Sequence, residues 1–215
     1  MTQVVPLATR REIARPARRL RPVRPRAATS RQPAVPNAVV ATLVFLGAEA
    51  MFFAGLISSL LVLRAGSDAW PPPDQPRLPI GVTAVNTLIL LASGYTIWLA
   101  VRAVRADRTR ELIRWLSATA LLGVLFLVVQ GTEWVRLVHY GLHVTSGTYG
   151  GTFYTLIGCH GVHVLAGVAL LLFVLRGATA QRYSARAHAA VEVCRLYWVF
   201  VVGVWPILYV LVYLV

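Results

Sequence analysis

Lysine is absent from this chain of 215 residues, and all 21 basic residues are arginine. Charged residues of both signs make up only 13% of the sequence, while hydrophobic residues make up 57%. So little charge cannot cover the surface of a protein this apolar in water. The composition therefore excludes a soluble globular protein and predicts an integral membrane protein.

Several functional signals are also missing from the sequence. It has no internal repeat, no glycine-rich phosphate loop and no soluble domain, which argues against nucleotide binding. Cys159 and Cys194 stand at no metal-like spacing, so we interpret them as small apolar side chains. The net charge of +13 does not require nucleic acid, because membrane topology and anionic lipid account for it.

Long hydrophobic runs are what the chain does have. About 20 apolar residues are needed for a helix to cross roughly 30 Å of hydrocarbon. The third run is interrupted on its far side by Gln130, Glu133 and Arg136, but the arginine distribution requires it to cross. We predict an all-α, polytopic membrane protein with five transmembrane helices, at about 38–63, 82–101, 115–137, 152–175 and 191–215.

The arginines predict the orientation of these helices. Eighteen lie before the first run, between the second and third, or around the connection of the fourth and fifth, against three in the other connections. The positive-inside rule then places the N-terminus inside and the C-terminus outside. Residues 1–36, rich in arginine and proline, are predicted to be a disordered cytoplasmic tail before the transmembrane domain of 37–215. Such a composition is also typical of a transit peptide.

Few ionisable or amide side chains fall inside the runs, and a central charge costs roughly 2.5 to 3.5 kcal/mol to insert. At about 1.5 Å of rise per residue, Glu49 and His163 both reach about 17 Å below their entry points. Small residues beside them predict that the first, third and fourth segments are mutual neighbours. The candidate site is an intramembrane polar seam of five residues: Glu49, Gln130, Glu133, His160 and His163.

Two other interpretations of these residues stay open. They are structural if their hydrogen bonds only hold helices together, each worth about 0.6 to 2 kcal/mol. A metal site would use His160 and His163 with Glu49 or Glu133, although no third histidine lies at membrane depth. Axial haem ligands belong on separate helices, whereas both histidines are on one. Glu192 with Arg195 is predicted to be an interfacial ion pair.

Four short stretches follow one another along residues 39–215. They are GAEAMFFAGL, NTLILLAS after a Leu-Pro pair, LFLVVQGTEW, and GTFYTLIGCHGVHVLAGV. In this order they resemble subunit III of the haem-copper oxidases, in its five-helix bacterial form. Val199 and Val202 depart from the resemblance, since that family usually has histidine and aspartate there. The branch therefore stays open among a cytochrome c oxidase, a quinol oxidase and an accessory subunit of a nitric oxide reductase.

The resemblance implies a non-catalytic subunit in a bacterial cytoplasmic membrane. Haem and copper are then expected on the partner, subunit I, and no cofactor or metal on this chain. The family binds phospholipid in a cleft between helix groups and supports proton uptake and turnover stability. Glu49 matches the family's carbodiimide-reactive glutamate, so we expect a neutral carboxyl group hydrogen-bonded within the bundle, with His163 as the candidate partner.

Two unrelated function classes would show features in addition to intramembrane polar residues. A small secondary transporter would carry paired, interrupted helices or an internal repeat, and the sequence shows neither. A free-standing membrane enzyme would need a convergent catalytic cluster, and no such motif is present.

Overall fold

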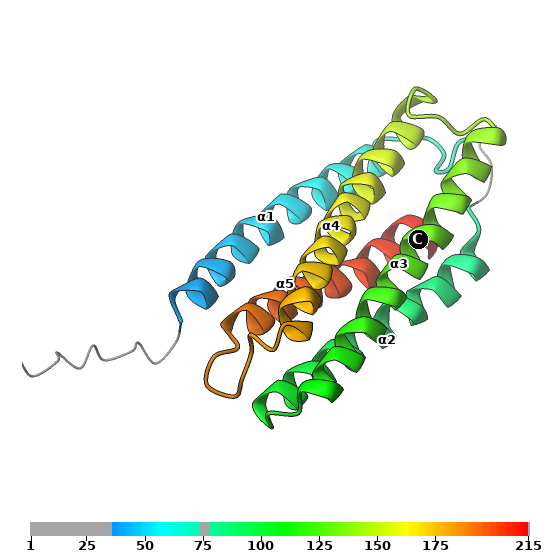
Figure 1. The fold of residues 1–215 in the computed structure, drawn as a ribbon. Coiled ribbons are helices and arrows are strands. Elements are labelled where there is room, and N and C mark those ends of the chain that lie inside the picture. Colours follow the sequence, from blue (N-terminus) through cyan, green and yellow to red (C-terminus); the bar gives the residue numbers. More distant parts are fainter. Residues whose placement is uncertain (1–35, 74–77, 215) are drawn as a thin grey trace, which may run out of the picture. The chain divides into compact units, whose positions relative to one another are not determined.

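The computed structural model describes residues 36–73 and 78–214, which form helices and no strand. All five main helices are long and apolar enough to cross a membrane. The prediction of an all-α bundle of five transmembrane helices is confirmed. The tail that the sequence predicts to be disordered, 1–36, lies outside the described residues except for Pro36. The helices are α1 (Asn37–Ala65), α2 (Ile80–Arg105), α3 (Thr109–His139), α4 (Gly147–Thr179) and α5 (Ala189–Tyr209), with a terminal π-helical turn η1 (Val210–Leu214) (Figure 1).

Proline and left-handed residues mark several helix ends. Pro36 and Pro79 directly precede α1 and α2, where a missing N–H is tolerated because the first turn has no acceptor inside the helix. Past the ends of α2 and α3, Asp107 has a φ of 54° and Gly141 a φ of 90°. Such residues turn the chain out of the helix, so these boundaries are set locally.

Helix α5 joins the other helices through two tryptophans seven residues apart. Trp198 donates from Nε1 to Oγ of Ser93 at 3.0 Å, and Trp205 donates from Nε1 to Oγ1 of Thr87 at 2.9 Å, so both bonds reach α2. The indole of Trp198 also fits against two glycines, Gly123 of α3 and Gly167 of α4. Because both indoles are fully buried and hydrogen-bonded, they define the core around which the helices pack.

Helix α1 is the least embedded of the five. Its only buried residues, Leu46, Phe53 and Leu60, are seven residues apart and form one narrow line. This line packs against α4 and α5, and Figure 1 shows α1 and α4 side by side. The rest of its apolar surface faces outward, as expected of a helix that contacts lipid or another protein.

The prediction that the first, third and fourth segments, now α1, α3 and α4, are mutual neighbours is correct only in part. Helix α4 packs against both α1 and α3, but α1 packs against α5 instead of closely against α3. Gly47 is one of the small residues that prompted the expectation, and it does not receive a neighbouring helix. A Cβ added there would meet nothing within 4 Å.

At one end of the bundle, a hydrogen bond connects the loop between α2 and α3 with the loop between α4 and α5. Oδ1 of Asp107, between α2 and α3, accepts from the backbone N–H of Ala185, between α4 and α5, at 2.6 Å. Burial raises the pKa of the nearby Tyr183 phenol above its usual value, and Cys194 adds to this while Arg182 opposes it. The two connections that carry most of the loop arginines are thus held together.

Candidate functional site

Glu49 and His163 form a hydrogen-bonded pair between α1 and α4. Nε2 of His163 lies 3.0 Å from Oε2 of Glu49, and Nδ1 of the same ring lies 2.7 Å from the carbonyl oxygen of Cys159. The expected hydrogen bond between these two side chains is therefore present. Both side chains are partly buried, with 19% of Glu49 and 18% of His163 exposed.

The partners of the imidazole restrict the protons that the pair can hold. A backbone carbonyl only accepts, so Nδ1 must donate to Cys159. In a neutral ring Nε2 is then an acceptor, and the Glu49 carboxyl group must donate to it. The other arrangement without net charge has an imidazolium donating to a carboxylate. In either case one proton is shared between Nε2 and the carboxyl group, and the pair has no net charge.

Aromatic side chains surround this pair. The Phe53 ring meets the His163 ring edge-on with centroids 5.1 Å apart, and the Phe52 centroid lies 6.3 Å away. The Tyr197 hydroxyl donates to the carbonyl oxygen of His163 at 3.2 Å, so α5 also reaches the site. Side chains of α1, α4 and α5 therefore meet at this pair.

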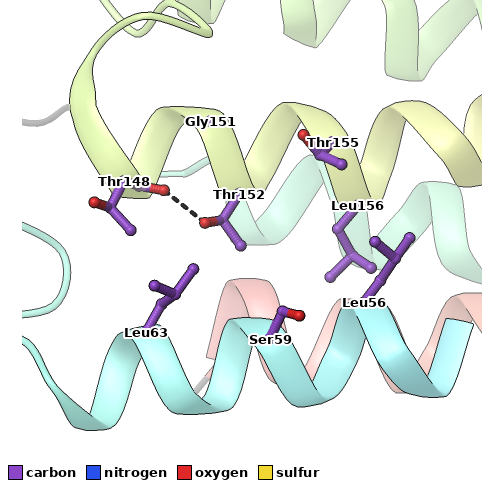
Figure 2. A pocket seen from close by; sticks show the side chains of 8 residues that line it. All are labelled: Leu56, Ser59, Leu63, Thr148, Gly151, Thr152, Thr155 and Leu156. Carbon is purple, nitrogen blue, oxygen red and sulfur yellow. Dashed lines mark hydrogen bonds between the residues drawn. The ribbon is translucent and has the colours of Figure 1, made fainter.

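A groove of about 310 Å³ opens between the same two helices, α1 and α4. Figure 2 shows Leu56, Ser59 and Leu63 of α1 opposite a row of α4 side chains. Hydroxyl groups from both helices line it alongside leucines, and Oγ1 of Thr152 donates to the carbonyl of Thr148. We call this the α1–α4 groove; its lining residues are Leu56, Ser59, Leu63, Thr148, Gly151, Thr152, Thr155 and Leu156.

Gln130 belongs to a different cluster, between α2, α3 and η1. Its Nε2 donates to the hydroxyl of Tyr213 at 3.1 Å, and its Oε1 lies 3.4 Å from Nδ2 of Asn86. Nδ2 of Asn86 also donates to the carbonyl of Phe126 at 3.2 Å. Gln130, Asn86 and Tyr213 are all buried. This network joins three elements and pairs all of its side-chain polar groups except Oδ1 of Asn86, which is a structural task.

Glu133 lies one turn further along α3 and pairs with Arg136. Their ion pair spans 2.8 Å from Oε1 to Nη1, with the carboxylate buried and the guanidinium exposed. The pair borders a separate pocket with Pro79, Val82 and Tyr140. A long arginine that reaches outward explains how a buried carboxylate is tolerated near a helix end.

His160 takes part in none of these hydrogen bonds or ion pairs. Its ring stacks on Trp205 with centroids 4.9 Å apart and meets Phe126 edge-on. Only 1% of its surface is exposed, and neither ring nitrogen has a hydrogen-bond partner among the described residues. The structure thus brings Glu49 and His163 together and leaves Gln130, Glu133 and His160 in three other environments.

Near the opposite end of the bundle, the expected pairing of Glu192 with Arg195 is confirmed. Arg105 of α2 approaches the same carboxylate at 3.6 Å, so the pair also links α2 with α5.

The two side chains that depart from the resemblance, Val199 and Val202, lie elsewhere on α5. Val199 is 43% exposed and borders a groove between α1 and α5, while Val202 is buried against Gly94.

Sequence reasoning missed the polar residues of α2. The residues Thr83, Asn86, Thr87 and Ser93 are all buried. Thr87 is the partner of Trp205, Ser93 that of Trp198, and Asn86 that of Gln130. One signal was available, because Thr83, Asn86 and Thr87 recur at helical spacing within an otherwise apolar run. No group of three or more histidine, cysteine, aspartate or glutamate side chains arranged to hold a metal ion occurs in the part of the chain that the structure describes.

Comparison with known proteins connects this architecture to a family. The family model described as cytochrome c oxidase subunit III matches residues 34–215. A cytochrome c oxidase subunit 3 from Synechocystis is 37% identical over 172 residues, which cover 80% of this chain and 72% of that protein. A probable cytochrome c oxidase subunit 3 from Nocardia farcinica is 35% identical, covering 84% of this chain and 89% of that protein.

A third relative, the cytochrome c oxidase subunit 3 of Thermostichus vulcanus, is 36% identical over 82% of this chain and 86% of its own length. The similarity spans all five helices. The chain therefore belongs to the cytochrome c oxidase subunit III family and is a multi-pass membrane protein.

Proposed function

We propose that this protein is a non-catalytic subunit of a haem-copper respiratory oxidase in a bacterial cytoplasmic membrane. The observation that carries the proposal is the family match over residues 34–215, which includes all five described helices that are long and apolar enough to cross a membrane. The protein packs against the catalytic subunit, which holds the haem and copper. Because the relatives are named cytochrome c oxidase subunit 3, cytochrome c is the proposed electron donor of the complex.

The two histidines in the middle of α4, His160 and His163, are poorly suited to hold the redox groups themselves. Both nitrogens of His163 are already engaged, one with a backbone carbonyl and one with Glu49. His160 is on the same helix, whereas haem iron with two axial histidines takes them from opposite faces of the porphyrin. Electron transfer is therefore assigned to the partner subunit.

Phospholipid binding is the second part of the proposal, and the α1–α4 groove is its site. Leucines along the groove suit an acyl chain, and the hydroxyl of Thr155 suits the ester region of a lipid. The groove lies between the same two helices as Glu49 and His163. A bound lipid would fill the space beside a helix that has only one narrow line of buried side chains.

Support of proton uptake and turnover stability is the third part. The Glu49–His163 pair can hold its shared proton on either partner without acquiring net charge. An uncharged pair can face lipid or a partner subunit without a counter-ion, which an isolated carboxylate could not do. We assign this pair the role of maintaining a neutral hydrogen-bonded contact between α1 and α4 during turnover.

Purification in mild detergent through an affinity tag on this chain tests the proposal. The tagged chain is expected to co-elute with a larger subunit whose absorbance spectrum shows haem and whose metal analysis shows copper. An oxidase prepared without this chain should keep its initial rate but lose activity sooner during turnover. A chain that elutes alone, or a complex without haem, would contradict the proposal.

A further inference from the structure

A second pocket, of about 280 Å³, lies between α3 and α4 and is distinct from the α1–α4 groove. It is close to the lower end of the size range of ligand pockets, about 300 to 1,000 Å³. Its outer lining includes Val162 and Leu165, which are 66% and 59% exposed. Both belong to the middle of a membrane-crossing helix, so an occupant would enter from the hydrocarbon and not from water.

Two ring side chains that line this pocket have unused hydrogen-bonding capacity. His160 is 1% exposed, and both its nitrogens lack a partner among the described residues. Nε1 of Trp134 is also buried without a partner there, and an indole N–H can only donate. Buried polar groups in native proteins are nearly always paired, so unpaired nitrogens on two side chains that line one pocket point to a ligand that accepts from them.

The remaining walls of the pocket are aromatic or flat. The Phe126 and Trp205 rings enclose His160, with centroids 6.3 Å and 4.9 Å from its own. Gly131 also lines the pocket and leaves open space beside its Cα, because a Cβ added there would meet nothing within 4 Å. Aromatic walls favour stacking or edge contacts with a planar ring.

We propose that this α3–α4 pocket binds the ring of a membrane-dissolved quinone, whose carbonyl oxygens accept hydrogen bonds from Trp134 and His160. A hydrocarbon chain would leave both nitrogens unpaired. A fatty acid carries its two oxygens on one carbon, whereas a quinone presents carbonyls at separate edges of one flat ring to donors from two helices. The alkyl tail of the quinone leaves the pocket past Val162 and Leu165. The inference concerns binding alone and does not depend on the proposed oxidase function.

Photolabelling with an azido-substituted, short-tailed quinone tests this site. The probe is irradiated with the full-length protein, purified together with the subunits that remain bound to it, and adducts are located by peptide mass spectrometry. Adducts on residues 126–134 or 157–165 are expected, and excess decylubiquinone should suppress them while palmitate should not. Suppression by palmitate, or adducts scattered over all helices, would overturn the proposal.

Substitutions give an independent decision. Trp134→Phe and His160→Phe keep a ring in place but remove the donors, and each should lower adduct yield about tenfold, the effect of one lost hydrogen bond that leaves its partner unpaired. Gly131→Leu should abolish labelling by filling the pocket. Gly81→Leu, where a Cβ also meets nothing within 4 Å, is the matched control and should label normally. Unchanged labelling in Gly131→Leu would refute the site even if a donor variant failed to fold.

Discussion

At the scale of single residues, hydrogen-bond partners decide what each polar side chain does. His160 and His163 are three residues apart on α4, yet one is enclosed by aromatic rings while the other bridges a carbonyl and a carboxyl group. A step of three residues turns the side chain by about 60° around the helix, which is enough to face a different neighbour. Residue type alone therefore says little about role here.

Glu49→Gln is expected to preserve the contact between α1 and α4. The glutamine amide can donate to Nε2 of a neutral His163 as the protonated carboxyl group does. Yield of the purified complex should stay close to that of the unaltered protein, while labelling of this position by dicyclohexylcarbodiimide should disappear. Loss of the chain from its complex in Glu49→Gln would contradict a neutral, hydrogen-bonded carboxyl group.

Glu49→Leu should behave differently because it leaves Nε2 of His163 without a partner. We expect the free energy of unfolding in mixed micelles to fall by about 0.6 to 2 kcal/mol, the range for intramembrane hydrogen bonds. Glu111→Gln serves as a control, since that side chain is exposed and makes only a surface ion pair. Equal stability of Glu49→Leu and the control would show that the hydrogen bond contributes nothing.

At the scale of helices, glycines contribute to packing where a bulky side chain of another helix lies against them. Gly123 and Gly167 come from different helices and face opposite parts of the Trp198 indole, whose N–H bonds to a third helix. By contrast, Gly47 and Gly55 of α1 face open space. Small residues in a membrane helix permit close approach, but the partner can be an indole as well as a backbone.

Gly123→Ala is expected to destabilise the bundle. The added Cβ would lie 2.5 Å from Cη2 of Trp198, a separation that forces the rigid, buried indole to move. We expect a loss of about 1 to 3 kcal/mol in the free energy of unfolding, typical of an overpacked core. Gly55→Ala, made where a Cβ meets nothing within 4 Å, should be nearly neutral.

A double substitution separates this clash from other effects. Trp198→Phe alone removes the hydrogen bond to Ser93 and leaves space, so it should also destabilise. In the double variant with Gly123→Ala, the smaller ring should accommodate the new methyl group. The double variant should therefore lose less free energy of unfolding than the sum of the losses in the two single variants. Strict additivity in this cycle would mean that the two side chains do not interact.

At the scale of the whole molecule, charge placement and helix number together predict the topology. Five crossings put the two ends of the helical domain on opposite sides of the membrane, and the arginine-rich connections should face the cytoplasm. The Asp107 to Ala185 hydrogen bond supports placing both of those connections on one side.

Single-cysteine labelling tests this orientation. With Cys159 and Cys194 replaced by alanine, Thr145→Cys should react with a membrane-impermeant maleimide in intact cells. Ser184→Cys, in the connection between α4 and α5, should react only after permeabilisation. The reverse pattern would invert the topology, and labelling of both positions from outside would contradict the crossing of α4.

The amino-acid sequence by itself determined that this protein lies in a membrane, that it has five helices and which family it belongs to. The reason is that the lengths of the hydrophobic runs and the order of the motifs are properties of the chain. It also indicated that Glu49 and His163 reach a similar depth. Only the tertiary structure decided which polar residues meet: Gln130 with Asn86 and Tyr213, Glu49 with His163, and His160 with no described hydrogen-bond partner. Depth follows from the rise along one helix, whereas contact depends on how each helix is rotated against its neighbours, and packing of whole side chains such as Trp198 and Trp205 sets that rotation.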